Sequence, residues 1–393
     1  MIAFEALSAQ HGDCLLVHDG GAPPSFLWLI DGGPAGVLHA SLLPRLAELA
    51  EAGKPARVTW GMISHIDDDH INGMETLLDD LVTATGSGGS RALTIARFWF
   101  NSFSALVGGS VPQAAGAEAT PQDIAAGLPP GLLGGDSHAD AVLQSVGQGE
   151  NVSASLRSLQ LTKNLPFDGL VEAPSVLDLP INTAKITVLG PRKNRVEALR
   201  KAWAKAVGEP TKAAREAALQ DLFLPARSLD KSVPNLSSIV VLAEFPSGSS
   251  ILLTGDARGD DIVATWTEMN GGQAPKKPIS ILKAPHHGSE RGFTAAFLDT
   301  FPARHYVFSA DGRFDNPDAR VVEAVVATQD KREITLHFTN DDIKWSKPYK
   351  MDTTGVVVET LDALIAELKK RPGTKATYAS RAKDALSLRI DLP

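Results

Sequence analysis

The sequence predicts a layered α/β protein, and three observations lead to that prediction. Apolar runs of strand length recur in both halves of the chain. Segments with apolar residues at helical spacing separate several of these runs. Acidic residues and histidines follow three of the runs closely, and α/β proteins place their sites at the carboxyl ends of strands. Strands interspersed with helices favour sheets covered by helices over a helical bundle.

The N-terminal part of the chain combines short strands with a strand–turn–helix unit. Its apolar runs are bounded by turn residues and predict strands at 2–8, 14–18, 26–31 and 57–63. Apolar residues at helical spacing predict helices over 39–52 and 74–82. Because the strand at 57–63 runs straight into His65, the loop that holds this histidine lies at the carboxyl end of a strand.

The second half shows the same kind of order. Two apolar runs around a Pro-Ser-Gly turn predict a hairpin of strands at 238–245 and 250–254. Further strands are predicted at 185–189, 280–284, 304–309, 333–338 and 355–360, with helices at 293–300 and 318–328.

Two segments interrupt this pattern. Glycine-rich and proline-rich stretches at 86–90 and 127–131 predict an insertion at about 85–150, partly irregular and a candidate lid, with a strand at 95–100. An Ala-, Lys-, Glu- and Arg-rich stretch predicts a helical insertion at 193–230. We therefore expect one domain over 1–393 with these two insertions and a C-terminal extension over 365–393.

The composition excludes several classes of protein. Of the 393 residues, 43% are hydrophobic and 21% are charged, which is ordinary for a globular protein. The formal net charge of −8 gives no basic footprint for broad nucleic-acid binding. Cys14 is the only cysteine, so an intramolecular disulfide and a cysteine-rich zinc site are excluded. The N-terminus does not resemble a signal peptide and no run has the length of a membrane span, so we expect a cytoplasmic protein with no membrane partner.

A cluster of four ionisable residues follows the strand at 57–63. His65, Asp67, Asp69 and His70 fall within six residues, and in an extended turn positions i and i+2 point to the same side. The competing interpretation is a helix cap, because an aspartate such as Asp69 often caps a helix that follows it. Later motifs reduce that alternative, since acidic and imidazole groups close behind apolar strands have little structural reason to be there.

The motifs together resemble a known superfamily. The run from His65 to His70, the Leu-Thr-Gly-Asp sequence that ends at Asp256, and the Pro-His-His-Gly-Ser sequence at 285–289 resemble the metallo-β-lactamase superfamily. More narrowly, they are similar to the metallo-hydrolase domain of the DNA-uptake competence protein ComEC and its free-standing relatives. The Asp-Gly-Gly turn at 31–33 and the Asn-x-x-Ser element at 235–238 match further parts of that branch.

The resemblance implies a fold and a ligand set. It implies a four-layer αβ/βα sandwich with inserted loop and helical segments and with metals at the edge between its two sheets. The first metal would take His65 and Asp67. The second would take Asp69 and His70, with Asp256 bridging the two metals. His287 or His286 would complete the second site, and we prefer His287.

Two departures from the superfamily's pattern affect the choice of metal. Most of the superfamily has histidine at the position of Asp67, whereas the ComEC-like branch resembles this chain in having aspartate there. The histidine that usually lies between the first motif and the bridging aspartate is not visible, and its place is taken by Gly190-Pro191. A site richer in oxygen shifts the preference from zinc toward manganese. We expect one or two divalent ions, Zn or Mn, with the second site the better ligated.

The implied activity is hydrolysis by a metal-bound hydroxide, with Asp69 and Asp256 as catalytic residues. The branch favours a phosphodiesterase or nuclease-type activity on a small molecule, a nucleotide or a single-stranded nucleic acid. Lactam, lactone or thioester hydrolysis on the same site is one alternative, and a non-catalytic binding protein with a degenerate metal site is another. The candidate substrate contacts are Lys283, Ser289 and Asn235.

Overall fold

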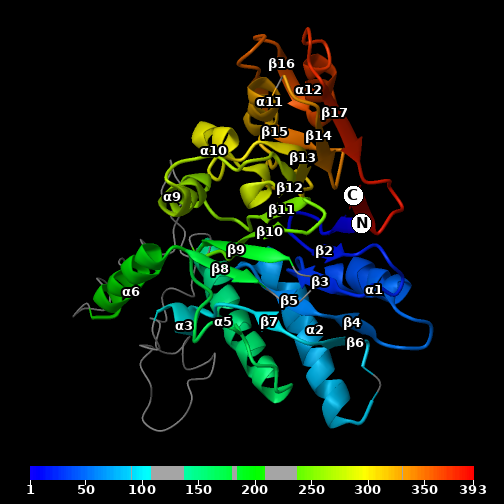
Figure 1. Cartoon of the computed structure of the whole chain (residues 1–393), viewed down its shortest axis with the longest axis vertical. Helices are drawn as coiled ribbons and strands as arrows, with labels where there is room; N and C mark the ends of the chain where they lie inside the picture. The colour runs from blue at the N-terminus through cyan, green and yellow to red at the C-terminus, as the bar shows by residue number, and fades with distance from the viewer. Residues whose placement is uncertain (90, 108–136, 179–183, 209–236, 330) are drawn as a thin grey trace.

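Two large β-sheets form the centre of the protein in the computed structural model (Figure 1), which describes all of residues 1–393 except 90, 108–136, 179–183, 209–236 and 330. The first sheet has six strands, and its order across the sheet is β18 (Ser387–Leu392), β1 (Ile2–Leu7), β2 (Leu15–His18), β3 (Leu27–Ile30), β5 (Trp60–Met62) and β7 (Phe98–Trp99). Strands β3, β5 and β7 run parallel to one another, so their carboxyl ends meet at one edge of the sheet.

The second sheet has eight strands. Its order is β17 (Ala376–Ser380), β14 (Ile334–Phe338), β13 (Ala303–Phe308), β12 (Ile279–Lys283), β11 (Ser250–Leu253), β10 (Val240–Glu244), β9 (Lys185–Gly190) and β8 (Ser175–Asp178). The neighbours from β11 to β17 pair in parallel, whereas β10 pairs antiparallel with β11 in the predicted hairpin. The carboxyl ends of β11, β12 and β13 therefore also share one edge.

Three apolar cores show how these sheets and the helices are layered. One core joins the inner faces of the two sheets, with Trp28 from the first sheet and Ile281 from the second among its members. A second core lies between the first sheet and its helices, and a third lies between the second sheet and its own helices. The molecule is thus a mixed α/β sandwich, with helices outside both sheets (Figure 1).

The helices divide between the two outer faces. Those on the side of the first sheet are η1 (Leu38–Leu42), α1 (Leu43–Leu49), α2 (Asp68–Gly86), α3 (Phe103–Leu106) and α5 (Ser137–Ser158). Those on the side of the second sheet are α9 (Gly259–Asn270), α10 (Ala295–Thr300), α11 (Ala319–Thr328) and α12 (Leu361–Leu368). None of the helices in the described part of the chain combines the length and the apolar character that a membrane span requires.

Successive residues of a strand face opposite sides of its sheet, and both sides are covered here. This explains why the predicted apolar runs are nearly continuous. In β3, Trp28 and Ile30 face the core between the sheets, while Leu27 and Leu29 face the helices. A strand covered on both faces has no position that favours a polar residue. The sequence therefore shows a solid apolar run rather than an alternating one.

Most of the predicted elements are confirmed, with local differences in their bounds. The run predicted as one strand at 57–63 is split at Thr59, whose N–H donates to the Leu27 carbonyl at 2.8 Å. Its first part, β4 (Ala56–Val58), pairs with β6 (Leu93–Ile95) in a separate two-stranded sheet. The strand predicted at 355–360 is β16 (Val357–Thr360), which pairs with β15 (Lys344–Lys350) outside the large sheets.

The segments predicted as insertions are partly built into the sandwich. Strand β7 fulfils the strand predicted at 95–100 and lies at the edge of the first sheet. Helix α5 begins before the predicted insertion ends and packs against α2. Residues 108–136 of the predicted insertion and candidate lid at 85–150 lie outside the described residues. Helix α6 (Lys193–Gly208) confirms the first part of the helical insertion, and the rest, at 209–230, also lies outside them.

The C-terminal residues 365–393 are not an appendage, because they supply one edge strand to each large sheet. Strand β17 pairs with β14 in the second sheet, and β18 pairs with β1 in the first. The buried Glu5 carboxylate on β1 accepts hydrogen bonds from Arg45 Nε at 2.7 Å and Ser387 Oγ at 2.5 Å, which ties α1 and β18 to the same strand. The prediction of an extension is therefore corrected.

A contact between two glycines docks the start of α2 on the end of β3. The Gly32 N–H donates to the His70 carbonyl at 2.7 Å, and the Gly73 N–H donates to the Gly33 carbonyl at 3.0 Å. A Cβ at Gly32 would lie 2.2 Å from the Met74 nitrogen, so no side chain fits there. This close approach fixes the position of His70 relative to the end of β3.

We expect Gly32→Ala to destabilise the fold by about 1–3 kcal/mol, because the added methyl group must push α2 away from β3. The control is Gly86→Ala at the end of the same helix, where an added Cβ meets nothing within 4 Å. That variant is expected to be neutral or slightly stabilising. Urea unfolding of both variants checks the prediction, and equal stability of the two would contradict it.

Candidate metal centre

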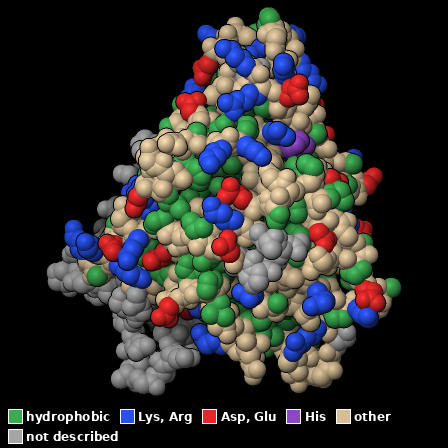
Figure 2. Space-filling model, in the orientation of Figure 1, with side chains coloured by type: hydrophobic (Ala, Val, Ile, Leu, Met, Phe, Trp, Pro, Cys, Tyr) green, Lys and Arg blue, Asp and Glu red, His purple; other side chains and the backbone are tan. Residues whose placement is uncertain are grey.

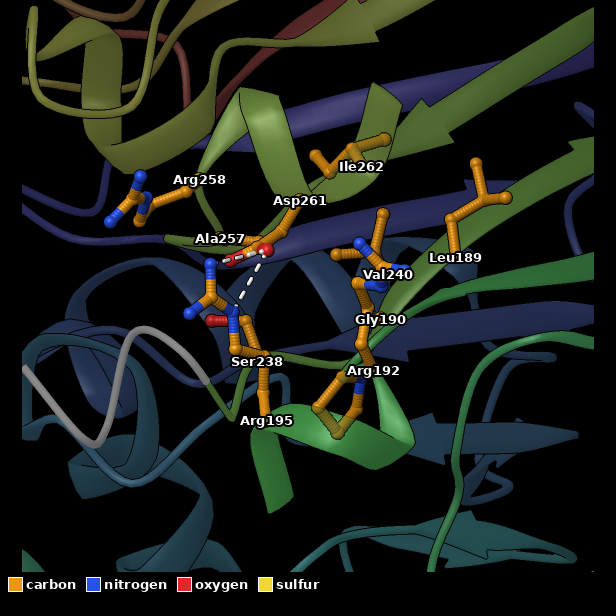
Figure 3. A pocket seen from close by; sticks show the side chains of 11 residues that line it. Leu189, Gly190, Arg192, Arg195, Ser238, Val240, Ala257, Arg258, Asp261 and Ile262 are labelled. Atoms are coloured by element: carbon orange, nitrogen blue, oxygen red, sulfur yellow. Dashed lines mark hydrogen bonds and ion pairs between the residues drawn. The ribbon is translucent and has the colours of Figure 1, made fainter. Parts of the chain in front are cut away.

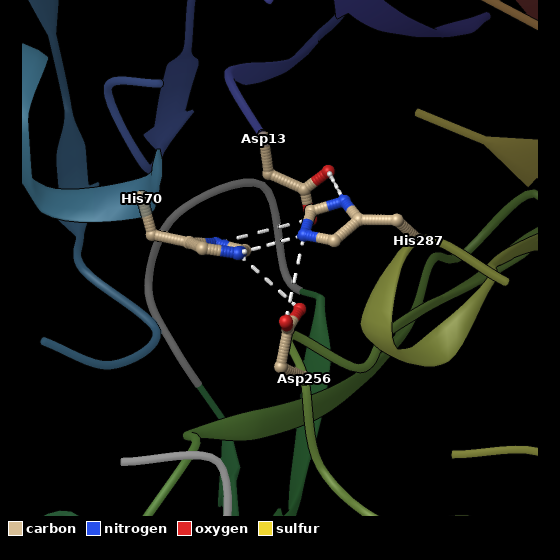
Figure 4. Close-up of side chains that lie close together, drawn as sticks. All are labelled: Asp13, His70, Asp256 and His287. Atoms are coloured by element: carbon tan, nitrogen blue, oxygen red, sulfur yellow. Dashed lines mark hydrogen bonds and ion pairs between the residues drawn. The ribbon is translucent and has the colours of Figure 1, made fainter. Parts of the chain in front are cut away.

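Loops that follow three strand ends bring the predicted ligands together. His70 lies in the first turn of α2, after β5, while Asp256 follows β11 and His287 follows β12. Because these strands end at adjacent edges of the two sheets, residues far apart in sequence point toward one another (Figure 4). Helix α2 begins at Asp68, and the side chain of its N-cap residue Asp67 makes no capping hydrogen bond.

Four side chains converge on one point. His70 Nε2 and His287 Nε2 are 3.1 Å apart. Asp256 approaches both rings, with Oδ1 3.2 Å from His70 Nε2 and Oδ2 3.4 Å from His287 Nε2. Asp69 Oδ2 lies 3.3 Å from His287 Nε2 and 3.9 Å from His70 Nε2. Ligands bound at zinc-like distances in a tetrahedron are separated by about 3.3 Å, so most of these separations match a shared ion.

Hydrogen bonds on the opposite side of each ring assign the imidazole protons. His70 Nδ1 lies 2.9 Å from Asp31 Oδ2, and His287 Nδ1 lies 2.8 Å from the Ser309 carbonyl. Both partners only accept hydrogen bonds, so both Nδ1 atoms carry a proton. In neutral imidazoles the two Nε2 atoms then present lone pairs to each other at 3.1 Å. Such an arrangement needs a cation or an added proton between them.

The charges of the cluster favour a positive centre. Burial opposes the charged form of His70, but the carboxylates of Asp256, Asp69 and Asp31 outweigh it and raise the pKa of this ring well above its usual range. Burial likewise opposes the charged form of His287, and Asp256 and Asp13 raise its pKa well above its usual range. The cluster stores positive charge as protons, and a divalent ion can replace those protons.

The pKa of the Asp256 carboxylate shifts in the opposite direction. Burial alone would raise the pKa of Asp256, but His287, His70 and His286 hold it well below its usual range. Asp256 is 3% exposed, and in the described chain the nearest donor to its buried Oδ1 is a protonated His70 Nε2, 3.2 Å away. When the His70 ring is neutral, this buried carboxylate oxygen has no donor, and a metal can satisfy such an acceptor.

Asp13 joins the cluster from the other side of His287. Asp13, His70, Asp256 and His287 are all buried, and each offers a ligand atom within 4.8 Å of the others, so this group could hold a metal ion. The Asp13 carboxylate, however, has Lys283 Nζ 2.7 Å from Oδ2 and His287 Nδ1 3.4 Å from Oδ1. Because a buried ammonium already balances its charge, we assign Asp13 to support of His287 and assign the fourth ligand position to Asp69.

The predicted first metal site is only partly formed. Ser64 Oγ lies 2.9 Å from His65 Nδ1, while His65 Nε2 is buried without a hydrogen-bond partner and lies 3.5 Å from Asp67 Oδ2. These two side chains fit the predicted pair of ligands. Gly190, where the resemblance would put a further histidine, lines a cavity of about 10 Å³ together with Ser238 (Figure 3). A Cβ at Gly190 would lie 2.8 Å from Val240 Cγ2, so an imidazole does not fit at this position.

The structure brings both predicted histidines of the 285–289 motif to Asp256, in different roles. His287 is 2% exposed and its Nε2 lies in the cluster, in agreement with the preferred assignment. His286 Nε2 lies 3.6 Å from Asp256 Oδ2, and its side chain is 21% exposed. Both residues adopt positive φ angles, 46° and 54°, which are costly for residues with a Cβ and concentrate at functional sites.

The three predicted substrate contacts have different outcomes in the structure. Lys283 has no exposed surface, and its ammonium group contacts Asp13 and donates to the Ala284 carbonyl at 2.9 Å, so its assignment to a substrate phosphate is corrected. Ser289 is 6% exposed, and its hydroxyl accepts the Arg291 N–H at 3.4 Å within the turn. Asn235 lies outside the described residues. Its partner in the motif, Ser238, accepts the Asp256 N–H at 3.3 Å through its hydroxyl.

Two residues that support the site, Asp13 and Ser309, are not predicted from the sequence, and Lys283 is predicted in a different role, as a substrate contact. Ser309 Oγ donates to the Gly12 carbonyl at 2.6 Å, so it links the turn of Asp13 to the loop after β13. The available signal was weak: an aspartate directly before an apolar run and a lysine inside one, each of which needs a partner when buried.

No protein-family model matches the chain, and no curated protein matches it significantly. The assignment of a function therefore depends on the residues of the site.

Metal affinity is expected to rise with pH through the neutral range. The raised pKa values of His70 and His287 mean that the metal-free protein keeps protons on these rings, and a metal must displace them. The metal therefore binds more tightly as the pH rises. At lower pH its binding releases protons from the two rings. Competition titrations with a chromophoric chelator between about pH 6 and 8.5, the range around the ordinary pKa of histidine, measure the slope. An affinity independent of pH would contradict this account.

Proposed function

We propose that this chain is a metal-dependent hydrolase with a metallo-β-lactamase fold of the ComEC-like kind, acting on phosphodiesters. The observation that carries the proposal is the pair of Nε2 atoms of His70 and His287, which meet at 3.1 Å beside the carboxylates of Asp256 and Asp69. Buried imidazoles whose far nitrogens are both bound to acceptors are prepared to ligate a metal.

The architecture supports the fold named in this proposal. Two sheets share a core and carry helices on their outer faces, and the candidate ligands gather at the edge between the sheets. The order of the ligand motifs along the chain agrees with the same fold. Many α/β proteins place their sites at the ends of strands. The ligand set is therefore stronger support for the proposed fold than the arrangement of layers is.

The ligand count favours an ion that accepts more than four ligands. Asp69, His70, Asp256 and His287 would fill a tetrahedral zinc ion completely, and such closed sites are structural. Manganese and similar ions prefer six ligands with a large share of oxygen, which would leave positions for water and substrate. An ion bound here supplies Lewis acidity, since it lowers the pKa of a coordinated water and stabilises negative charge on the substrate.

The residues of the chain divide the remaining tasks. Asp31 and the Ser309 carbonyl hold His70 and His287 in the tautomers that present Nε2 to the ion. Asp69 is the most open of the four ligands, with a side chain 22% exposed, so it can accept a proton from the attacking water as well as bind. His65 and Asp67 lie next to this group and can hold a second ion or orient the substrate.

The face shown in Figure 2 and the net charge favour a small or single-stranded substrate. On the face shown in Figure 2, basic and acidic side chains are interspersed rather than gathered into a long area of one sign. The net charge of −8 points in the same direction. Duplex DNA is held largely by rows of Lys and Arg against its phosphates, and this face of the described chain offers no such row.

A metal-by-substrate screen tests the proposal. Protein stripped of metal and reconstituted with Mn²⁺ or Zn²⁺ is assayed against bis-p-nitrophenyl phosphate, a single-stranded oligonucleotide, nitrocefin and an acyl-lactone. We expect phosphodiester hydrolysis that depends on added metal and is stronger with Mn²⁺. Hydrolysis of nitrocefin or the lactone with none of the phosphodiesters would contradict the proposed substrate class. Failure to retain any ion after reconstitution would favour a non-catalytic binding protein.

A further inference from the structure

The loop after β13 carries an aromatic side chain that packing does not explain. Phe314 is 67% exposed, the highest value among the large apolar side chains of the described residues. Single exposed apolar residues are common on protein surfaces, so the interest of Phe314 lies in its position beside the candidate metal centre. Its only contact with another ring in the described chain is His11, with ring centroids 5.3 Å apart in a T-shaped arrangement.

The loop holds Phe314 in place by its own hydrogen bonds. The Gly312 N–H donates to the Asn316 carbonyl at 3.1 Å, and the Asp315 N–H donates to the Gly312 carbonyl at 3.0 Å. Asp315 Oδ1 accepts the Ser346 N–H at 2.6 Å, which ties the loop to β15. An aromatic ring displayed on a turn with this many fixed contacts requires little ordering when it binds a ligand.

Both ends of this loop are fixed to the metal centre. At its start, the Ser309 carbonyl accepts the hydrogen bond from His287 Nδ1 at 2.8 Å. At its end, the Asp318 N–H donates to the Gly288 carbonyl at 3.0 Å. The loop therefore arches from one side of His287 to the other, and Phe314 lies on the solvent side of that arch.

His11 connects Phe314 to the open side of the centre. His11 belongs to the same turn as Asp13, whose N–H donates to the Asp69 carbonyl at 3.2 Å. Burial lowers the pKa of His11, and the carboxylate of Asp69 opposes that shift, as expected for a ring close to this ligand. Arg313 Nη1 lies 3.4 Å from His11 Nδ1, so a guanidinium group stands at the same rim.

These features combine an exposed aromatic ring and a cation next to a site suited to a phosphodiester. We propose that Phe314 stacks on a nucleobase adjacent to the scissile phosphate, while Arg313 contacts the phosphate backbone and His11 supports the ring. This inference rests on the proposed phosphodiesterase function and names its substrate class as a base-carrying phosphodiester. Aromatic stacking accepts any base, so we expect little preference for sequence.

The test compares ligands with and without bases. A fluorescent phosphorothioate oligothymidylate, which resists hydrolysis, and an abasic strand of equal length and backbone are titrated with Mn²⁺-loaded protein, and anisotropy reports binding. Phe314→Ala is expected to weaken binding of the thymidylate about 5- to 150-fold and to leave the abasic strand unchanged. Phe314→Trp should restore the binding of the thymidylate. Arg313→Ala should weaken both ligands alike, because phosphate contacts do not read the base.

Val357→Ala is the matched control, since Val357 is another large apolar residue, 59% exposed, on the small sheet of β15 and β16. It is expected to bind both ligands as the wild type does. The dinucleotide thymidylyl-thymidine, used as a competitor, distinguishes a base beside the reacting phosphate from a base farther along a strand. Its potency should fall with Phe314→Ala, and an unchanged potency would overturn the placement.

Other outcomes separate this inference from the proposed function. If Phe314→Ala has no effect on the thymidylate, or an equal effect on both strands, stacking on a base is excluded and a different partner for Phe314 is indicated. If the wild type binds neither strand, the inference fails. If the wild type binds the thymidylate through Phe314 but hydrolyses no phosphodiester, the recognition of bases stands and the proposed catalytic function is wrong.

Discussion

Replacing Asp256 with alanine is expected to remove metal-dependent hydrolysis and to weaken metal binding by more than about 100-fold, the upper loss for a residue that merely orients a ligand. Among the described residues, Asp256 is the one carboxylate within 3.4 Å of both central Nε2 atoms. Its removal leaves His70 and His287 facing each other without the negative charge that balances an ion. Metal content after dialysis and the initial rate with bis-p-nitrophenyl phosphate provide the two measurements.

The matched control for this variant is Asp299→Ala, which removes a carboxylate from an exposed position on α10. It is expected to keep its metal and its activity. Activity of Asp256→Ala close to that of the control would show that the proposed centre is not where hydrolysis occurs. Loss of activity with full metal retention would instead move Asp256 from metal binding to the handling of protons.

Lys283→Met is expected to destabilise the protein by about 3–5 kcal/mol, because it leaves a buried carboxylate without its counter-charge. Lys283 and Asp13 are 0% and 1% exposed, and their charged atoms are 2.7 Å apart. Burial opposes ionisation of Asp13, but Lys283 and His287 hold its pKa well below its usual range, so the carboxylate is charged at neutral pH. Urea unfolding of the metal-free protein measures the loss.

The double variant Lys283→Met with Asp13→Asn isolates the charge pair. Removal of both charges should recover part of the stability that the single variant loses, since no ion then remains buried alone. Lys277→Met, at an exposed position before β12, is the control for loss of a lysine and is expected to change stability little. A double variant no more stable than Lys283→Met would show that the pair is not coupled as the structure indicates.

The layers of the fold were largely predictable because burial on both faces leaves a simple trace in the sequence. Strands such as β3 and β12 appear as apolar runs, and the pattern predicts them without knowledge of their neighbours. The edge strands were harder. Residues 387–392 alternate between buried and half-buried or exposed positions, but six alternating residues do not reveal which sheet they join. The sequence pattern therefore predicts only an extension for the C-terminal segment.

The candidate ligands could be predicted because they are histidines and aspartates that follow the ends of apolar strands. The sequence could not decide between His286 and His287, since both lie in left-handed backbone conformations that a strand pattern does not anticipate. It also missed the pairing of Lys283 with Asp13, because a contact between residues 270 positions apart appears only when the sheets are assembled. The local signs that buried partners are needed are a lysine inside one apolar run and an aspartate directly before another.

Anomalous diffraction from crystals grown with Mn²⁺ locates a bound ion without reference to activity, and so shows whether His70 and His287 hold one. We expect a strong peak within coordination distance of His70 Nε2, His287 Nε2 and the carboxylate of Asp256, with Asp69 as the fourth ligand. A second, weaker peak beside His65 and Asp67 would be compatible with the partly formed first site. A protein that takes up no ion, or one whose ion lies away from His70 and His287, would show that these residues do not form a metal centre.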